Sequence, residues 1–316
     1  MAKTSTSPEL SIIITVVEGS RALSRCLEAL AQQTGPPSME VIVPYDETVS
    51  EVASLAQRFP SVVLMNLGSL ADKKSVSNEF TQHILFDRRR AAGLRAAKGN
   101  LIAMIEDRVQ PRADWAASMR DLHKSHADAV IGGAIDNGAD DPLRWAVFFA
   151  DFGRFQPPIE QEDAEYVSDI NICYKREALE SVRNLWENRY QEPKVNWALR
   201  RHGHKLRISE KALVVQERAK IGLWSLIKER FHWGRTFGRI RGQEASRSKL
   251  LVFALACPLL PYVLFVRHFR RQLGKRRHVA EYIKASPALL LLLHWWFLGE
   301  FVGYCDAAFG TASRLR

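Results

Sequence analysis

The sequence predicts an α/β fold, in which helices flank a doubly wound and mostly parallel sheet, followed by an apolar and basic helical tail. Three observations favour this class. Short apolar runs alternate with segments of helical periodicity over the first 135 residues. Acidic residues directly follow several of these runs, and the chain beyond residue 240 combines long apolar stretches with many Lys and Arg residues.

The apolar runs have the composition of strands that are buried on both faces. The first run, LSIIITVV at residues 10–17, precedes a predicted helix at 21–32, with Ser20 as its N-cap. An Arg- and Ala-rich helix ends at Gly99, just before another apolar run. The remaining predicted strands lie at residues 40–43, 62–64, 101–105 and 129–135. Strands and helices that alternate in this order indicate a doubly wound sheet.

Charged residues follow two of the predicted strands. Glu106, Asp107 and Arg108 come directly after one strand, and Asp46 comes shortly after another. In open α/β sheets, ligands bind beyond the carboxyl ends of the strands. These side chains therefore suit a phosphorylated ligand, with or without a metal ion, and the alternative is a solvated turn with ordinary salt bridges. No GxGxxG motif follows the first strand, which argues against a dinucleotide-type phosphate loop.

Over roughly residues 8–240 the chain resembles family-2 glycosyltransferases of the GT-A fold. Their opening strand, turn and helix stand here as SIIITVVEGSRALSRCLEALAQQT, with Glu18 where the family often has Asn. Their Val-Asp-Asp-Gly-Ser turn stands as VPYDET, which keeps only Asp46 of the two acids. Their Arg-Asn-x-Gly-Leu helix appears as RAAGL from Arg90, and their Asp-x-Asp signature as Glu106-Asp107-Arg108.

The resemblance implies a set of residues that bind a nucleotide sugar. Asp46 would contact the nucleoside, and Asn171, in the segment VSDINICYKR, would lie under the donor sugar. The whole predicted set is Glu18, Asp46, Arg90, Glu106, Asp107, Arg108 and Asn171.

Two departures from the family pattern concern a divalent cation. In metal-dependent members the last acid of Asp-x-Asp ligates magnesium or manganese, which prefer oxygen ligands. Arg108 stands at that position, and the segment VVQER that ends at Arg218 lacks the family's His. A guanidinium can pair with a diphosphate instead. We expect weak metal dependence, or a cation held by Glu106 and Asp107 with Asp107 as the metal ligand; the alternative is that neighbouring residues supply the ligands.

The resemblance also implies a catalytic base. An inverting transfer needs a carboxylate that takes the proton of the acceptor hydroxyl. Counting back from Gly203, the family's Glu-Asp pair falls on Gln191-Glu192, which makes Glu192 the predicted base and Glu187 the second candidate. The alternative for Glu192 is an acid in the first turn of a helix, beside Pro193 and stabilised by the helix dipole.

The predicted acceptor half contains an aromatic stretch and a polar loop. Phe148 and Phe149 are expected in the core, and residues 156–165 form either a mobile lid or an ordinary surface loop. The segment ERFHWGR, which begins at Glu229, occupies the place of the Gln-x-x-Arg-Trp motif of processive members and keeps only its Trp. This departure favours transfer of a single sugar.

The charge of the chain is unevenly distributed. The net charge is +10, and residues 200–316 contain 23 Lys and Arg against 7 Asp and Glu, whereas residues 1–199 contain 22 against 28. This pattern favours a polyanionic partner. The apolar segments 250–266 and 288–298 favour an anionic membrane surface over nucleic acid, for which the sequence has no binding signature.

A simple membrane crossing conflicts with the charges. If residues 250–266 crossed from the cytoplasm, the basic linker after them would lie outside, against the positive-inside rule. We therefore expect 250–266 and 288–304 to be re-entrant or interfacial, on the cytoplasmic face of the cell membrane. The alternative is a pair of buried core helices in a larger soluble domain. The polar N-terminus has no signal-peptide pattern, and four scattered cysteines indicate free thiols.

These inferences predict a catalytic domain at residues 1–240, with a nucleotide-sugar half at about 8–130 and an acceptor half at 131–240, and a membrane-associated tail at 241–316. The resemblance implies an inverting transfer from a nucleotide sugar, with UDP first, to a lipid-linked or cell-envelope glycan acceptor. Two other classes stay open. One is a non-catalytic scaffold of the same fold, which the altered metal motif favours, and the other is a membrane-bound nucleotidyltransferase.

Overall fold

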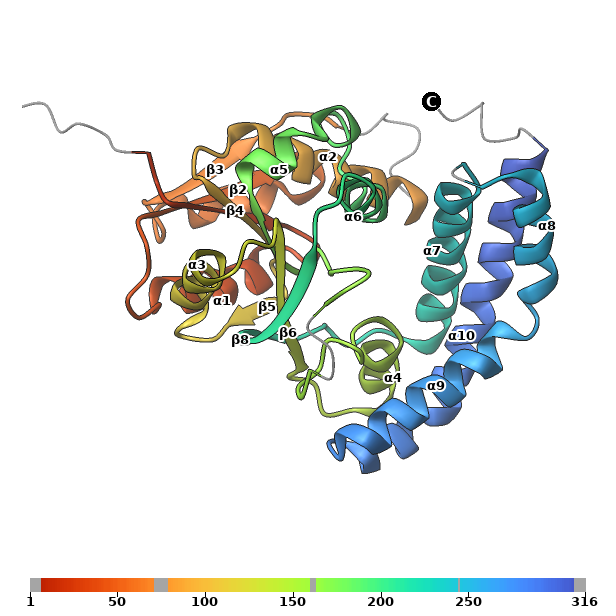
Figure 1. The fold of residues 1–316 in the computed structure, drawn as a ribbon. Coiled ribbons are helices and arrows are strands. Elements are labelled where there is room, and N and C mark those ends of the chain that lie inside the picture. The colour runs from red at the N-terminus through yellow and green to blue at the C-terminus, as the bar shows by residue number, and fades with distance from the viewer. Residues whose placement is uncertain (1–6, 71–78, 160–162, 244, 310–316) are drawn as a thin grey trace, which may run out of the picture. The chain divides into compact units, whose positions relative to one another are not determined.

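The structure is a computed structural model that describes residues 7–70, 79–159, 163–243 and 245–309 (Figure 1). Contacts divide the chain into two compact units. Unit 1 comprises residues 1–138 and 155–217, and unit 2 comprises residues 139–154 and 218–316. The predicted boundary at residue 240, between a catalytic domain and a membrane-associated tail, stays a prediction.

Unit 1 contains one mixed sheet of eight strands in the order β3-β2-β1-β4-β7-β6-β8-β5. The pairs β1–β2, β2–β3, β1–β4 and β6–β8 are parallel. Strand β7 is antiparallel to β4 and β6, and β5 is antiparallel to β8. The strands are β1 (Leu10–Thr15), β2 (Met39–Tyr45), β3 (Val62–Asn66), β4 (Leu101–Glu106), β5 (Val109–Pro111), β6 (Val130–Asn137), β7 (Asn171–Lys175) and β8 (Leu206–Gln216). The predicted α/β class with a mostly parallel sheet is confirmed.

Helices cover both faces of this sheet. Helices α1 and α3 lie on one face, and α2 and α6 lie on the other (Figure 1). This arrangement follows from right-handed crossovers that run in opposite directions from β1 and from β3. The helices of unit 1 are α1 (Ser20–Ala31), η1 (Glu47–Ala56, a 3₁₀ helix), α2 (Glu79–Ala96), α3 (Trp115–Ser125), α5 (Arg176–Glu180), η2 (Arg183–Leu185, also 3₁₀) and α6 (Glu192–Arg201).

The turn from β1 into α1 differs from the prediction by one residue. Gly19 is the N-cap and Ser20 is the first helical residue, so the expectation of Ser20 as N-cap was wrong. Gly19 has a φ of 103°, a conformation that residues with a Cβ adopt only under strain. The glycine therefore lets the chain turn sharply at the carboxyl end of β1, where the charged residues gather.

Unit 2 consists of the helices α4 (Pro142–Asp151), α7 (Leu223–Gln243), α8 (Arg247–Ala256), α9 (Leu260–Lys275) and α10 (Val279–Ala308). Phe148 and Phe149 on α4 are buried, as predicted. Helices α7 and α10 approach each other closely through glycines. A Cβ atom at Gly238 would lie 2.4 Å from the carbonyl oxygen of Glu300, and one at Gly299 would lie 2.0 Å from that of Phe231. Only glycine fits at these crossing points.

The described part of the apolar tail forms the helices α8, α9 and α10. Among the described residues, α10 is the one single helix long and apolar enough to cross a membrane, and 44% of its most apolar window is buried within the protein. The predicted segment 250–266 lies in α8 and α9, which are bent by 69° and would pass the same test together. Several apolar side chains of α8 and α9 are exposed, among them Leu255 at 71% and Val263 at 58%.

Candidate active site

Charged side chains of unit 1 gather at the carboxyl ends of three adjacent parallel strands. Glu106 is the last residue of β4 and pairs in register with Thr15, the last residue of β1. Asp46 directly follows β2, and Glu18 follows β1 in the turn to α1. The structure thus brings the predicted acids to one edge of the sheet, where open α/β folds bind ligands.

Asp46 is buried and fully engaged. Its carboxylate accepts hydrogen bonds from the backbone N–H and hydroxyl of Thr48, at 2.8 and 2.6 Å. The guanidinium of Arg89 donates to both of its oxygens at 3.1 Å and to the carbonyl of Val16 at 2.7 Å. Burial alone would raise the pKa of Asp46, but the bonds from Arg89 and Thr48 outweigh it and hold the pKa below its usual value. Asp46 is therefore a fixed negative charge between β1, β2 and α2.

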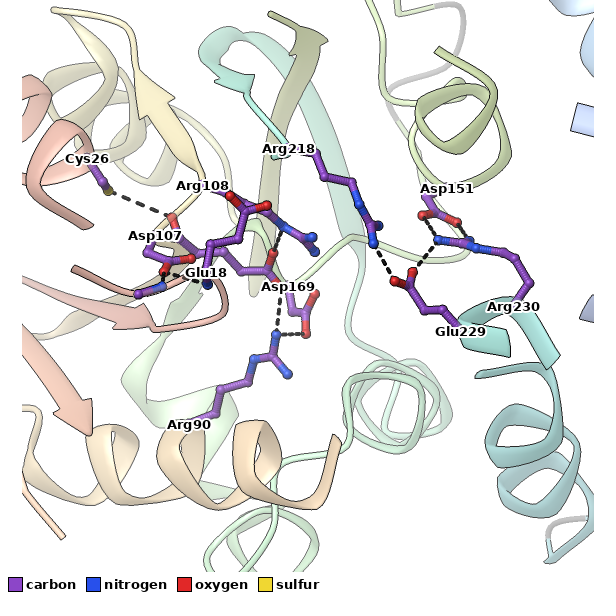
Figure 2. A network of polar contacts seen from close by, with 12 residues as sticks. Glu18, Cys26, Arg90, Asp107, Arg108, Asp151, Asp169, Arg218, Glu229 and Arg230 are labelled. Atoms are coloured by element: carbon purple, nitrogen blue, oxygen red, sulfur yellow. Dashed lines mark hydrogen bonds and ion pairs between the residues drawn. The ribbon is translucent and has the colours of Figure 1, made fainter. Parts of the chain in front are cut away.

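Asp107 holds the turn after β1. Its Oδ2 accepts hydrogen bonds from the backbone N–H groups of Glu18 and Gly19, both at 2.9 Å (Figure 2). Its Oδ1 is buried and has no hydrogen-bond partner among the described residues. Burial raises the pKa of Asp107 to about 7, although the two backbone donors favour the ionised form. The predicted binding residue Glu18 is exposed, and its backbone connects it to Asp107.

Arg90 on α2 is the centre of a second network. Its guanidinium lies 3.0 Å from Glu106 Oε1 and 2.9 Å from Asp169 Oδ2 (Figure 2). A weaker contact of 4.0 Å reaches Asp87. The other oxygen of Glu106 accepts from Nε of Arg108 at 2.7 Å. All five side chains are at least 85% buried, and the network joins three of the predicted residues to two acids that sequence analysis had not selected.

Glu192, the predicted base, is the first residue of α6 and is buried. Glu192 therefore also has the position that the alternative interpretation required, in the first turn of α6 beside Pro193. The side chain of Glu192 shares a hydrogen bond with Asp169 and another with Tyr166. Burial, followed by the charge of Asp169, raises the pKa of Glu192 well above its usual value.

The second candidate base lies outside this network. The side chain of Glu187 is 43% exposed, and its ion pair with Arg183 measures 3.7 Å. Because a surface acid in such a pair is well solvated, Glu187 has the environment of an ordinary surface residue.

Asn171, the first residue of β7, is buried. Its side-chain amide donates to the carbonyls of Ala134 and Ala212, both at 2.9 Å, and its oxygen accepts from Nε1 of Trp115 at 2.9 Å. A Cβ atom at Gly133 would lie 2.2 Å from this amide nitrogen. The amide thus ties β6, β7, β8 and α3 together inside the protein, and its role beside a donor sugar stays a prediction.

The structure adds Arg89, Asp87 and Asp169 to the residues predicted for the site. Arg89 belongs to the visible run Arg88-Arg89-Arg90, but only the helix orientation shows that Arg89 pairs with Asp46 while its neighbour pairs with Glu106. Asp169 stands two residues before Asn171, and nothing local distinguishes it from a loop acid.

The described residues do not form a metal site with three protein ligands. Among the residues that the structure describes, no three His, Cys, Asp or Glu side chains converge as ligands. Glu106 is engaged by two guanidinium groups and one oxygen of Asp107 by two backbone donors. Ligation by Asp107 stays a prediction.

Unit 2 holds its own charged cluster. Arg218, at the segment where the family has a His, pairs with Glu229 on α7, which also lies 3.0 Å from Arg230 (Figure 2). Arg230 in turn contacts Asp151 of α4 at 2.9 Å. The cluster joins α4 to α7 and is largely buried.

Comparisons with known proteins agree with this fold. No family model matches the chain. In sequence it is similar to Glycosyltransferase AglE of Haloferax volcanii, with 22% identity over 297 residues, 92% of this chain and 93% of that protein. In structure it is similar to TarS of S. aureus (residues 1–349, in complex with UDP-GlcNAc), with a TM-score of 0.50 and 12% identity over 97% of this chain and 92% of that chain.

A second solved structure is the mannosyltransferase PcManGT from Pyrobaculum calidifontis, in complex with GDP-Man and Mn²⁺. Its TM-score is 0.46 and its identity 13%, over 99% of this chain and 77% of that chain. The chain thus has glycosyltransferase homologues over almost its whole length, and its GT-A-like fold is confirmed.

Proposed function

We propose that the chain is an inverting glycosyltransferase that moves a single sugar from a nucleotide sugar, with a UDP-sugar as the first candidate, to a lipid-linked or cell-envelope glycan. One observation carries the proposal. Three arginines (Arg89, Arg90 and Arg108) and several acids are buried together at the carboxyl ends of β1, β2 and β4, on a sheet of GT-A type. Buried charges concentrated at such an edge are typical of a binding site for a charged ligand.

The contacts support distinct roles within this site. Asp46, fixed by Arg89, would accept a hydrogen bond from the nucleoside at the end of β2. Arg108 would face the diphosphate, with Glu106 orienting its guanidinium. Asp107 would keep the turn after β1 in place through Glu18 and Gly19.

The proton of the acceptor hydroxyl would be taken by the carboxyl pair of Asp169 and Glu192. In an inverting transfer the acceptor oxygen forms its bond to the anomeric carbon as the bond from that carbon to the diphosphate oxygen breaks. The carboxyl pair is linked through Arg90 to Glu106, and so to the residues proposed for the diphosphate. Such a link would hold base and leaving group in a fixed geometry, which favours reaction.

We propose that α8 and α9 rest on an anionic membrane surface. Both helices expose large apolar side chains, and Arg267, Arg270 and Arg276 are exposed on α9 and directly after it. Apolar residues beside basic ones suit the interface of an anionic bilayer. In vesicle flotation, Val263→Glu should lower binding to anionic vesicles strongly, whereas Val63→Glu, at an exposed valine of unit 1, should not. Equal binding of both variants and wild type would exclude this surface.

The first experiment is calorimetric titration of UDP into the detergent-purified full-length protein, with manganese and then with EDTA. Binding in both conditions, weakened at least about tenfold by Arg108→Ala, is the expected result, because the guanidinium supplies positive charge to the diphosphate. Arg112→Ala is the matched control, since that side chain is 46% exposed and pairs with Asp114. Binding only with manganese would still support a glycosyltransferase, but it would contradict the proposal that Arg108 replaces the charge of a metal ion.

A panel of UDP- and GDP-sugars then tests the activity itself through release of the nucleoside diphosphate. Failure of UDP and GDP to bind in either condition would favour the scaffold alternative. Release of pyrophosphate from a nucleoside triphosphate would identify a nucleotidyltransferase.

A further inference from the structure

The carboxyl pair beside Arg90 is not symmetric. Asp169 lies in the loop just before β7 and is only partly buried, whereas Glu192 begins α6 and is buried. Arg90 contacts Asp169 at 2.9 Å. We propose that Asp169, rather than Glu192, takes the proton of the acceptor hydroxyl, and that Glu192 holds the proton of the pair and positions Asp169. This inference rests on the proposed transferase function.

Two carboxyl groups that share a hydrogen bond cannot both be ionised without a large repulsion, so the pair retains one proton. The position of the neighbouring guanidinium decides where the negative charge lies. Burial raises the pKa of Asp169, but the contact with Arg90 at 2.9 Å, the hydrogen bond from Glu192 and the charge of Arg108 favour its ionised form, so the negative charge of the pair is assigned to Asp169. Burial and the charge of Asp169 both raise the pKa of Glu192 well above its usual value, so the proton of the pair is assigned to Glu192, which donates it to Asp169.

Only an ionised carboxylate can act as the base. In the proposed step the proton of the acceptor hydroxyl moves to Asp169. The acceptor oxygen bonds to the anomeric carbon, and the nucleoside diphosphate leaves with the electron pair of the broken bond. Glu192 stays neutral throughout, and Asp169 returns its proton to water afterwards. A carboxylate has enough acceptor sites for Arg90, Glu192 and the incoming hydroxyl together.

Paired substitutions distinguish the two acids. Glu192→Gln keeps a hydrogen-bond donor toward Asp169, so turnover of the nucleotide sugar identified in the panel, with water as acceptor, should fall less than about tenfold. Asp169→Asn removes the ionisable group and should lower turnover by about 10² or more. UDP affinity should stay within about threefold for both, because neither acid is proposed to bind the nucleotide. Glu187→Gln is the matched control at a 43% exposed glutamate.

The pH profile separates a positioning role from a merely structural one. Turnover should fall at acid pH as Asp169 is protonated, and this limb should persist in Glu192→Gln. Loss of turnover by 10² or more in Glu192→Gln, with normal UDP affinity, would overturn the inference and restore Glu192 as the base. The turnover of Glu192→Gln therefore shows which of the two acids is the base, even if Asp169→Asn does not fold.

Infrared spectroscopy tests the location of the proton without any substrate. At pH 8 the difference spectrum between wild type and Glu192→Gln should contain the C=O band of one protonated carboxyl group. A difference spectrum without this band would refute a protonated Glu192. If no nucleotide sugar in the panel is turned over while the band is present, the transferase proposal fails and the assignment of the proton stands.

Discussion

Replacing Arg90 by glutamine tests the charged network most directly. The guanidinium is 8% exposed and lies 2.9 Å from Asp169, 3.0 Å from Glu106 and 4.0 Å from Asp87. Glutamine keeps polarity but removes the positive charge, so the buried carboxylates lose their common partner. Removing one partner of a buried ion pair destabilises proteins by about 3–5 kcal/mol. We expect a loss of this size in the free energy of unfolding at pH 8.

The loss should depend on pH in a defined direction. Burial already raises the pKa of Asp87 to about 6 in the wild type and raises that of Asp169, and without Arg90 both pKa values should rise further. A carboxyl group with a raised pKa binds its proton more tightly in the folded state than in the unfolded state. Stability of the variant therefore falls as pH rises. The penalty should be smaller at pH 5 than at pH 8, by about 1.4 kcal/mol for each pKa unit of added shift.

Hydrogen exchange of the amides in β4, followed by mass spectrometry at pH 5 to 8, reports the local stability of unit 1. The control is Arg112→Gln, since Arg112 and Asp114 are 46% and 49% exposed, and such pairs contribute less than about 1 kcal/mol. A loss in Arg90→Gln of under about 1 kcal/mol that does not change with pH would refute the network as described.

Two further changes test other parts of the molecule. Gly238→Ala should destabilise unit 2 by about 1–3 kcal/mol or more, because the new Cβ would lie 2.4 Å from the carbonyl oxygen of Glu300. Gly222→Ala is its control, as nothing lies within 4 Å of that Cβ, and equal thermal unfolding of the two variants would contradict the packing of α7 on α10. Asp107→Asn should stabilise the protein by about 2–4 kcal/mol above pH 7 and change little near pH 4. The reason is that the folded-state pKa is raised from 3.8 to about 7, so the wild type loses stability as pH rises through that window. Urea denaturation at several pH values checks this, and parallel stability curves for both proteins would exclude it.

The sequence predicted the strands of unit 1 well where the signal was local. In the run at residues 10–15 four of the six residues are Leu or Ile and all six are buried, which is the composition that burial on both faces favours. Which strands pair with one another, and in which direction, has no comparable local signal in the sequence. That β7 runs antiparallel between β4 and β6 depends on contacts between residues about 70 positions apart, such as Met104 with Ile172. The contacts of Asn171 with Trp115, Ala134 and Ala212 are equally non-local, which explains why its interior role was missed.

The candidate site shows the same limit. Asp46, Glu106 and Asp107 could be selected because parallel strands end at one edge of the sheet and acids that follow them must meet there. Asp169 could not, because its place beside Arg90 depends on how the loop before β7 packs against α2. Sequence position also could not show that the charge of the carboxyl pair lies on Asp169 and its proton on Glu192.

The buried acids of unit 1 are poorly explained as a device for stability. Burial raises the pKa values of Asp107 and Asp87 to about 7 and about 6, so their charged forms weaken the fold near neutral pH. Apolar residues of similar size would often be neutral or stabilising in such places. Oδ1 of Asp107, moreover, is buried without a hydrogen-bond partner among the described residues. An arrangement that costs stability yet gathers at the ligand-binding edge of the sheet is expected where ligand contacts, absent from the protein alone, complete the network.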